Sequence, residues 1–224
     1  MFFASTPPSF PKIIAPTADI VAKSKPSPEG KALLKPEMTP AQYQASLEKK
    51  KLSVDSVHFL AHGLPERDAL CWACKACGLV MGKLSGPELE AFKLAGAWVK
   101  APSLDLHVSL NACLGKVDFR GPGSWACQGA LWAGIPGMPA VALAVIGAIL
   151  LAAGLRIGPA MPPIPMPKLQ VPMLPLPPEM MLQLLKPKLP ALTLPVLDQP
   201  KLMKLLFPFI DLGKGVALGT LTCY

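Results

Sequence analysis

Three cysteines are the residues in this chain best placed to do chemistry: Cys71, Cys74 and Cys77 have the spacing C-x2-C-x2-C. Thiolates at this spacing hold iron–sulfur clusters or zinc, with Cys113, Cys127 or a histidine as the fourth ligand. On a helix, however, neighbouring members of the trio lie about 60° apart and share one broad face. Because the flanking residues are mostly small or apolar, core packing of the cysteines is the favoured interpretation, and a metal or redox site is the alternative.

The histidines form no complete catalytic or metal-binding pattern. His58 and His62 stand at i and i+4 and share a helical face, but the segment lacks the glutamate of a zincin helix, so helix packing is favoured. His107 and Cys113 lie on one predicted helix, yet nothing in the sequence orients them as a base and its nucleophile. The sequence also contains no phosphate-binding loop, dinucleotide fingerprint or hydrolase elbow. We therefore expect a non-enzymatic protein without a cofactor.

The composition points to a large core or to lipid, and away from nucleic acid. The chain is 51% hydrophobic and 16% charged, against about 25% charged in a typical soluble domain. Its net charge of +8 divides evenly, because residues 1–120 hold fifteen Lys or Arg against eleven Asp or Glu, and residues 121–224 hold seven against three. A nucleic-acid groove needs a denser basic stripe, interleaved with aromatic residues, than this sequence contains.

Start and stop signals predict an all-α fold. Thr39 and Pro40 are a helix cap followed by proline at the first helical position, and Gly63 suits a helix end. Five helices joined by short turns are expected at 39–50, 53–63, 65–81, 85–100 and 103–117. Further helices are expected at 124–133, 140–155, 201–206 and 209–218, with Pro208 separating the last two. This order suits an antiparallel helical bundle or a helical-repeat-like stack.

Prolines set the expected domain organisation. Residues 1–38 are predicted to be an extended, proline-containing arm with room for a short helix at 17–24 or 29–34. Residues 39–156 form the helical domain, and residues 201–224 form a C-terminal helix that packs back on it. Between them, residues 157–200 are expected to be a proline-rich apolar strap or linker. An SH3-type ligand is the alternative for this strap, since Pro162 and Pro165 have PxxP spacing.

The most apolar predicted helix can be interpreted as a core helix or as a membrane helix. Residues 121–155 carry no charged side chain, and alanines recur at every fourth position as Ala140, Ala144, Ala148 and Ala152, a face suited to close helix packing. The stretch 140–155 spans about 24 Å as a helix, whereas a bilayer requires about twenty residues. A buried core helix is favoured, and a membrane-inserted helix near 137–156 is the alternative.

Two further expectations concern the tryptophans and the location of the protein. Trp72, Trp98, Trp125 and Trp132 are expected to form packing contacts or a partner surface. The N-terminus lacks the basic region and the long apolar run of a secretory signal. We therefore expect a cytoplasmic protein with six reduced cysteines, and association with the inner membrane is the alternative.

Two stretches carry a family resemblance: Ser-Val-His-Phe-Leu-Ala-His-Gly-Leu-Pro-Glu-Arg-Asp-Ala-Leu-Cys-Trp-Ala-Cys at 56–74, and Ala-Phe-Lys-Leu-Ala-Gly-Ala-Trp-Val-Lys-Ala-Pro at 91–102. On these residues the chain resembles an uncharacterised bacterial all-helical family found near type VI secretion genes. With weaker matches at 130–134, 141–153 and 209–217, the resemblance covers roughly residues 40–156 and 201–219. It implies an accessory or binding role in a secretion system and offers no catalytic residue.

The sequence thus predicts a non-enzymatic protein-interaction or accessory component linked to type VI secretion, whose partner is another protein. A membrane-anchored protein and a metal or redox protein that uses Cys71, Cys74 and Cys77 are the alternatives.

Overall fold

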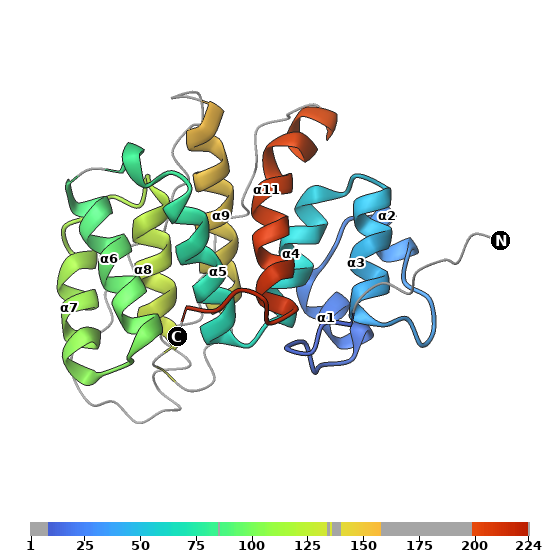
Figure 1. Ribbon diagram of the computed structural model, residues 1–224, viewed down its shortest axis with the longest axis horizontal. Coiled ribbons are helices and arrows are strands. Elements are labelled where there is room, and N and C mark those ends of the chain that lie inside the picture. Colours follow the sequence, from blue (N-terminus) through green and yellow to red (C-terminus); the bar gives the residue numbers. More distant parts are fainter. Residues whose placement is uncertain (1–8, 85, 134, 136–139, 158–198, 224) are drawn as a thin grey trace.

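The computed structural model describes residues 9–84, 86–133, 135, 140–157 and 199–223, and every regular element in these ranges is helical. The predicted all-α fold is therefore confirmed. The helices are α1 (Thr17–Ser24), α2 (Pro28–Ala32), α3 (Pro40–Lys49), α4 (Ser53–Gly63), α5 (Glu66–Gly78), the 3-10 turn η1 (Met81–Lys83), α6 (Gly86–Lys100), α7 (Leu104–Leu114), α8 (Pro122–Ala133), α9 (Val141–Ile157) and α11 (Gln199–Ala217) (Figure 1).

Local capping chemistry explains where several helices begin. The Thr39 hydroxyl accepts from the backbone N–H of Gln42 at 3.3 Å, and the Gln42 side chain accepts from the backbone N–H of Thr39 at 2.9 Å. This reciprocal pair satisfies two backbone donors at the start of α3. The Ser103 hydroxyl caps α7 by accepting from the backbone N–H of Leu106. Helix α4 begins at Ser53 as expected, with Leu52 at the N-cap position and no side-chain cap.

The helices form a layered stack with an edge helix at one end. Helix α7 packs on α6 and α8. Helix α6 packs on α5 and α8, and α8 packs on both α5 and α9. Helix α5 contacts α11, and α9 contacts α4 and α11. Helices α1 and α3 pack on α4 at the opposite end of the molecule (Figure 1). Among the described helices, α5 and α9 therefore occupy the middle of the stack, and α7 packs on α6 and α8 at its edge.

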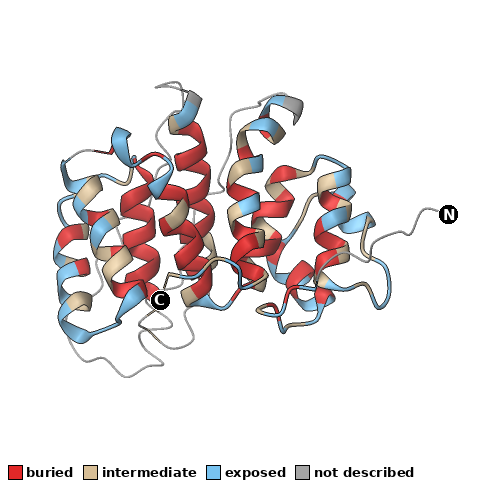
Figure 2. Ribbon diagram, in the orientation of Figure 1, coloured by how far each residue is buried: buried red, intermediate tan, exposed pale blue. Residues whose placement is uncertain are grey.

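Helix α9 is buried among other helices. Ala140, Ala144, Ala148 and Ala152 are all 3% exposed or less, and Figure 2 shows α9 buried along most of its length. A side chain on Gly129 of α8 would stand 3.2 Å from the Cβ of Ala144, so small residues let α8 and α9 approach closely. The faces that an inserted helix at 137–156 would present to lipid here contact α4, α5, α8 and α11. None of the described helices combines the length and the apolar character that crossing a bilayer requires.

The described part of the N-terminal arm folds onto the stack. Helix α1 packs on α4, and Ile20 is 1% exposed there. Prolines permit this because they stand at helix ends: Pro16 precedes α1, and Pro28 is the first residue of α2, where its missing N–H costs no hydrogen bond. Residues 9–38 thus contain short helices and a buried face as well as extended chain.

The C-terminal helix is continuous, which corrects the expected break at Pro208. Helix α11 runs from Gln199 to Ala217 through this proline. Pro208 removes one backbone donor, but Leu206, Phe209 and Ile210 on either side are at most 1% exposed, and α11 packs on α4 and α5. Tertiary packing therefore outweighs the lost hydrogen bond. The strap predicted at 157–200, with its PxxP alternative, lies outside the described residues apart from the helix ends at 157, 199 and 200.

Candidate functional site

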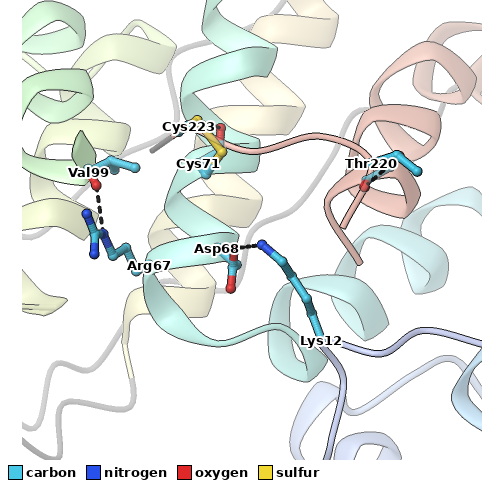
Figure 3. Close-up of polar contacts among 8 residues, drawn as sticks. Lys12, Arg67, Asp68, Cys71, Val99, Thr220 and Cys223 are labelled. Atoms are coloured by element: carbon cyan, nitrogen blue, oxygen red, sulfur yellow. Dashed lines mark hydrogen bonds and ion pairs between the residues drawn. A yellow bond between two sulfur atoms is a disulfide. The ribbon is translucent and has the colours of Figure 1, made fainter. Parts of the chain in front are cut away.

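Several residues of the stretch 56–74 lie on α5 and connect it to its neighbours (Figure 3). Arg67 donates from Nε to the carbonyl oxygen of Val99 and from Nη2 to that of Lys100, both at 2.7 Å. These carbonyls belong to the last turn of α6, where backbone acceptors lack helical partners. The guanidinium therefore caps α6 and compensates the negative end of its dipole.

The next residue, Asp68, fixes the N-terminal segment. Its carboxylate is paired with the Lys12 ammonium, and the two side chains are 9% and 21% exposed (Figure 3). The backbone N–H of Lys12 also donates to the carbonyl of Ala217 at 3.3 Å, at the end of α11. Lys12 thus joins the arm to both α5 and α11.

Trp72 connects α5 to α11. Its indole N–H donates to the carbonyl oxygen of Phe209 at 2.7 Å, and the side chain is fully buried. A Cβ on Gly213 would stand 2.6 Å from the indole Cε2, so only glycine lets α11 approach this closely. Trp98, Trp125 and Trp132 are also buried, at 6% exposure or less. All four tryptophans are core residues, and a partner surface on them stays a prediction.

The cysteine trio is divided between two environments, which corrects the expectation of six reduced thiols. Cys71 forms a disulfide with Cys223, with a Cα–Cα distance of 5.7 Å (Figure 3). The C-terminal segment reaches α5 from α11 after a turn in which Thr220 donates to the Gly215 carbonyl. A thiol engaged in a disulfide is not a metal ligand. In the ranges that the structure covers, no three His, Cys, Asp or Glu side chains are grouped to hold a metal ion.

The remaining four cysteines are buried thiols. Cys74 and Cys77 lie on α5, Cys113 on α7 and Cys127 on α8. Burial raises the pKa of Cys74 to about 12 and raises that of Cys77 well above its ordinary value. Because the thiolate is the nucleophile, Cys74 and Cys77 are core residues that have little reactivity at neutral pH while α5 stays packed.

One cleft, of about 440 Å³, gathers titratable groups: Lys23 of α1, His62 of α4 and Glu66 of α5, opposite Val141 and Ala142 of α9. Burial, followed by the nearby positive groups, lowers the pKa of His62 to about 4, so its imidazole is neutral at pH 7. Burial also raises the pKa of Glu66. No serine, threonine or cysteine is among the described residues that line the cleft, so His62 has no nucleophile to activate there.

The outer face of α7 carries an apolar strip that sequence reasoning missed. Leu104 is 78% exposed and Val108 is 53% exposed, and Ala112 continues the strip at the same helical spacing. On the opposite face of α7, Leu110 and Cys113 are buried against the stack. We call Leu104, Val108 and Ala112 the α7 ridge. The i, i+4, i+8 spacing is visible in the sequence, but it does not say which face of α7 is covered.

Fold and contacts together define an all-α stack whose central helix α5 is clamped to its neighbours by Arg67, Asp68, Cys71 and Trp72. The chain belongs to DUF6931, a family of unknown function whose family model matches residues 43–161, from α3 to just beyond α9. This confirms the resemblance to an uncharacterised family. No curated protein and no solved structure matches the chain.

Proposed function

We propose that this protein is a non-enzymatic interaction component that binds another protein through the α7 ridge. The observation that supports the proposal is the exposure of Leu104 and Val108 on the edge helix. Isolated exposed apolar residues are common on protein surfaces, but here they follow one helical face.

The ridge has the form of a helix face that docks into an apolar groove. Such grooves bind apolar side chains at positions i and i+4 of a helix, and Ala112 extends the strip by a further turn. Ser109, Asp105 and Lys116 flank the ridge and are exposed, as expected for a polar rim around an apolar contact. Burying one Val or Leu side chain contributes about 1.5–3 kcal/mol, so these residues can supply a substantial part of a binding free energy.

We further propose that this binding serves a type VI secretion system, in which the protein is an accessory component. The support is the resemblance at 56–74 and 91–102. Arg67, Asp68, Trp72 and Trp98 in these stretches maintain the fold, so the proposed binding face lies on different residues from those that carry the resemblance.

The test is affinity purification of the full chain, with quantitative mass spectrometry, from cells that carry the protein's own gene neighbourhood. The wild type is compared with the double variant Leu104→Ser, Val108→Ser. Recovery of a ridge partner should fall at least about tenfold, since 1.4 kcal/mol is a factor of ten. Ile14→Ser is the matched control, because Ile14 is 90% exposed at the other end of the stack. Equal recovery with the ridge variant contradicts the proposed binding face, and a partner outside the secretion apparatus contradicts the type VI assignment.

A further inference from the structure

Cys113 and Cys127 are buried neighbours inside the stack. Cys113 lies on α7 and Cys127 on α8, two helices that pack directly on each other. The Cys127 thiol contacts the carbonyl oxygen of Leu110 at 3.7 Å, one turn before Cys113 on the same buried face of α7. Both cysteines are at most 1% exposed, and each affects the pKa of the other. Two cysteines placed on facing turns of packed helices need little backbone movement to become bonded.

We propose that Cys113 and Cys127 are an oxidisable dithiol that forms a second disulfide and fixes α7 covalently to α8. The structure already contains one disulfide, Cys71–Cys223, so the fold accommodates a cross-link between distant parts of the chain. The second bond would hold the edge helix, whose packing partners are α6 and α8, to the interior. This inference rests on the α7–α8 packing and on the contact of the Cys127 thiol with the Leu110 carbonyl, and it is independent of the proposed function.

The reaction is thiol–disulfide exchange with a low-molecular-weight disulfide such as oxidised glutathione. Cys113, deprotonated, attacks one glutathione sulfur, which forms a mixed disulfide and releases one glutathione thiol. Cys127, deprotonated, then attacks the Cys113 sulfur and releases the second glutathione. The two protein thiols are oxidised, one glutathione disulfide is reduced to two thiols, and the two protons go to solvent and to the leaving thiolates.

The order of attack follows from the position of the two helices. Cys113 stands on the edge helix, which can separate from the stack locally without disturbing α5 or α9. Burial raises the pKa of both thiols. The exchange therefore proceeds through transient opening of α7, and it is slow compared with the oxidation of an exposed thiol.

The test uses the full chain, equilibrated with oxidised glutathione, then alkylated in denaturant and digested with trypsin without reduction. Trypsin cuts after Lys116 and Arg120, so the peptides that contain Cys113 and Cys127 stay joined only through a disulfide. We expect this linked pair, and the loss of two of the four free thiols. A sample treated in denaturant throughout verifies that the oxidant is active.

Two variants distinguish this pairing from others. Cys113→Ala should leave Cys127 fully alkylated, whereas Cys74→Ala should leave the 113–127 link intact, because Cys74 also lies near Cys127. Helical circular dichroism checks that each variant is folded, and Cys127→Ala replaces Cys113→Ala if the latter is not. Retention of all four thiols, a Cys74–Cys127 link or an unresolved glutathione adduct would each overturn the proposal.

Discussion

Helices α5 and α7 differ in how many of their side chains make contacts with the rest of the fold. Helix α5 is tied to α6 by Arg67, to the N-terminal segment by Asp68, to the C-terminal segment by Cys71 and to α11 by Trp72. Helix α7 buries Leu110 and Cys113 against the stack and leaves Leu104 and Val108 exposed. Packing therefore explains the side chains of the central helix, but it does not explain the apolar side chains on the outside of the edge helix.

This difference separates residues that maintain the fold from those available for binding. A change at Arg67, Asp68, Cys71 or Trp72 removes a contact with another element, so its effect should appear as lost stability. A change at the exposed side chains of Leu104 and Val108 should cost the stack much less. If this separation holds, substitutions on the two helices and their neighbours should differ in their effect on stability.

The largest effect is expected for Trp72→Ala. The change leaves a cavity between α5 and α11 and removes the hydrogen bond to Phe209. Loss of a buried tryptophan typically costs about 3–5 kcal/mol. Urea unfolding followed by circular dichroism measures the effect, with Trp72→Phe as a milder control that keeps most of the apolar volume. A loss below about 1 kcal/mol would mean that the centre of the stack is not tightly packed.

Glycines in two layers provide a matched pair. A Cβ on Gly147 of α9 would lie 2.2 Å from the Trp125 ring, whereas a Cβ on Gly96 of α6 meets nothing within 4 Å. Gly147→Ala should destabilise the protein by roughly 1–3 kcal/mol through overpacking. Gly96→Ala should stabilise it by up to about 1 kcal/mol through the better helix propensity of alanine. Thermal unfolding of both variants tests this, and a stabilising Gly147→Ala would contradict the close α8–α9 packing.

The pH dependence should reveal the partly buried His62. Its pKa falls from 6.5 to about 4 on folding, so the unfolded chain binds the proton first as the pH is lowered. The contribution of the neutral His62 imidazole to the free energy of unfolding is therefore complete above pH 6.5 and is lost progressively as the pH falls towards 4. Between these two pH values the unfolding free energy of the wild type should fall by on the order of 1–2 kcal/mol more than that of His62→Gln. Parallel stability curves for the two proteins would show that His62 is solvated.

The smallest effect is expected on the α7 ridge. Leu104→Ser and Val108→Ser should change the unfolding free energy by no more than about 0.5 kcal/mol, as exposed substitutions usually do. Leu110→Ala, on the buried face of the same helix, should cost roughly 2–5 kcal/mol. Urea unfolding of the three variants makes the comparison within one helix. A large loss from the ridge variants would mean that the ridge is part of the core.

Local signals in the sequence predicted most helices well. Thr39 and Pro40 marked the start of α3, and the range expected for the first short helix, 17–24, is that of α1. These signals work because a cap or a proline acts on the backbone within one turn. The helix predicted at 65–81 ends earlier, at Gly78, and a separate 3-10 turn occupies Met81–Lys83. Helix ends are set by weaker local preferences and shift readily by a few residues.

Long-range contacts could not be read from the sequence. The thiol spacing of Cys71, Cys74 and Cys77 suggested a shared site, but the partner of Cys71 is 152 residues away. The break expected at Pro208 did not occur, because the packing of Phe209 and Ile210 is a tertiary effect. Exposure of Leu104 likewise depends on α7 being the edge helix. In each case the outcome depends on residues that are distant in the sequence, which local sequence patterns do not reveal.

The Cys71–Cys223 disulfide has a topological consequence. It closes a covalent ring whose ends are 152 positions apart, and residues 158–198, with their many prolines, belong to that ring. A protease that cuts one peptide bond inside the ring linearises the loop without releasing a fragment. The cut chain stays a single molecule of 23.7 kDa, apart from the water gained, until a reductant separates its two parts.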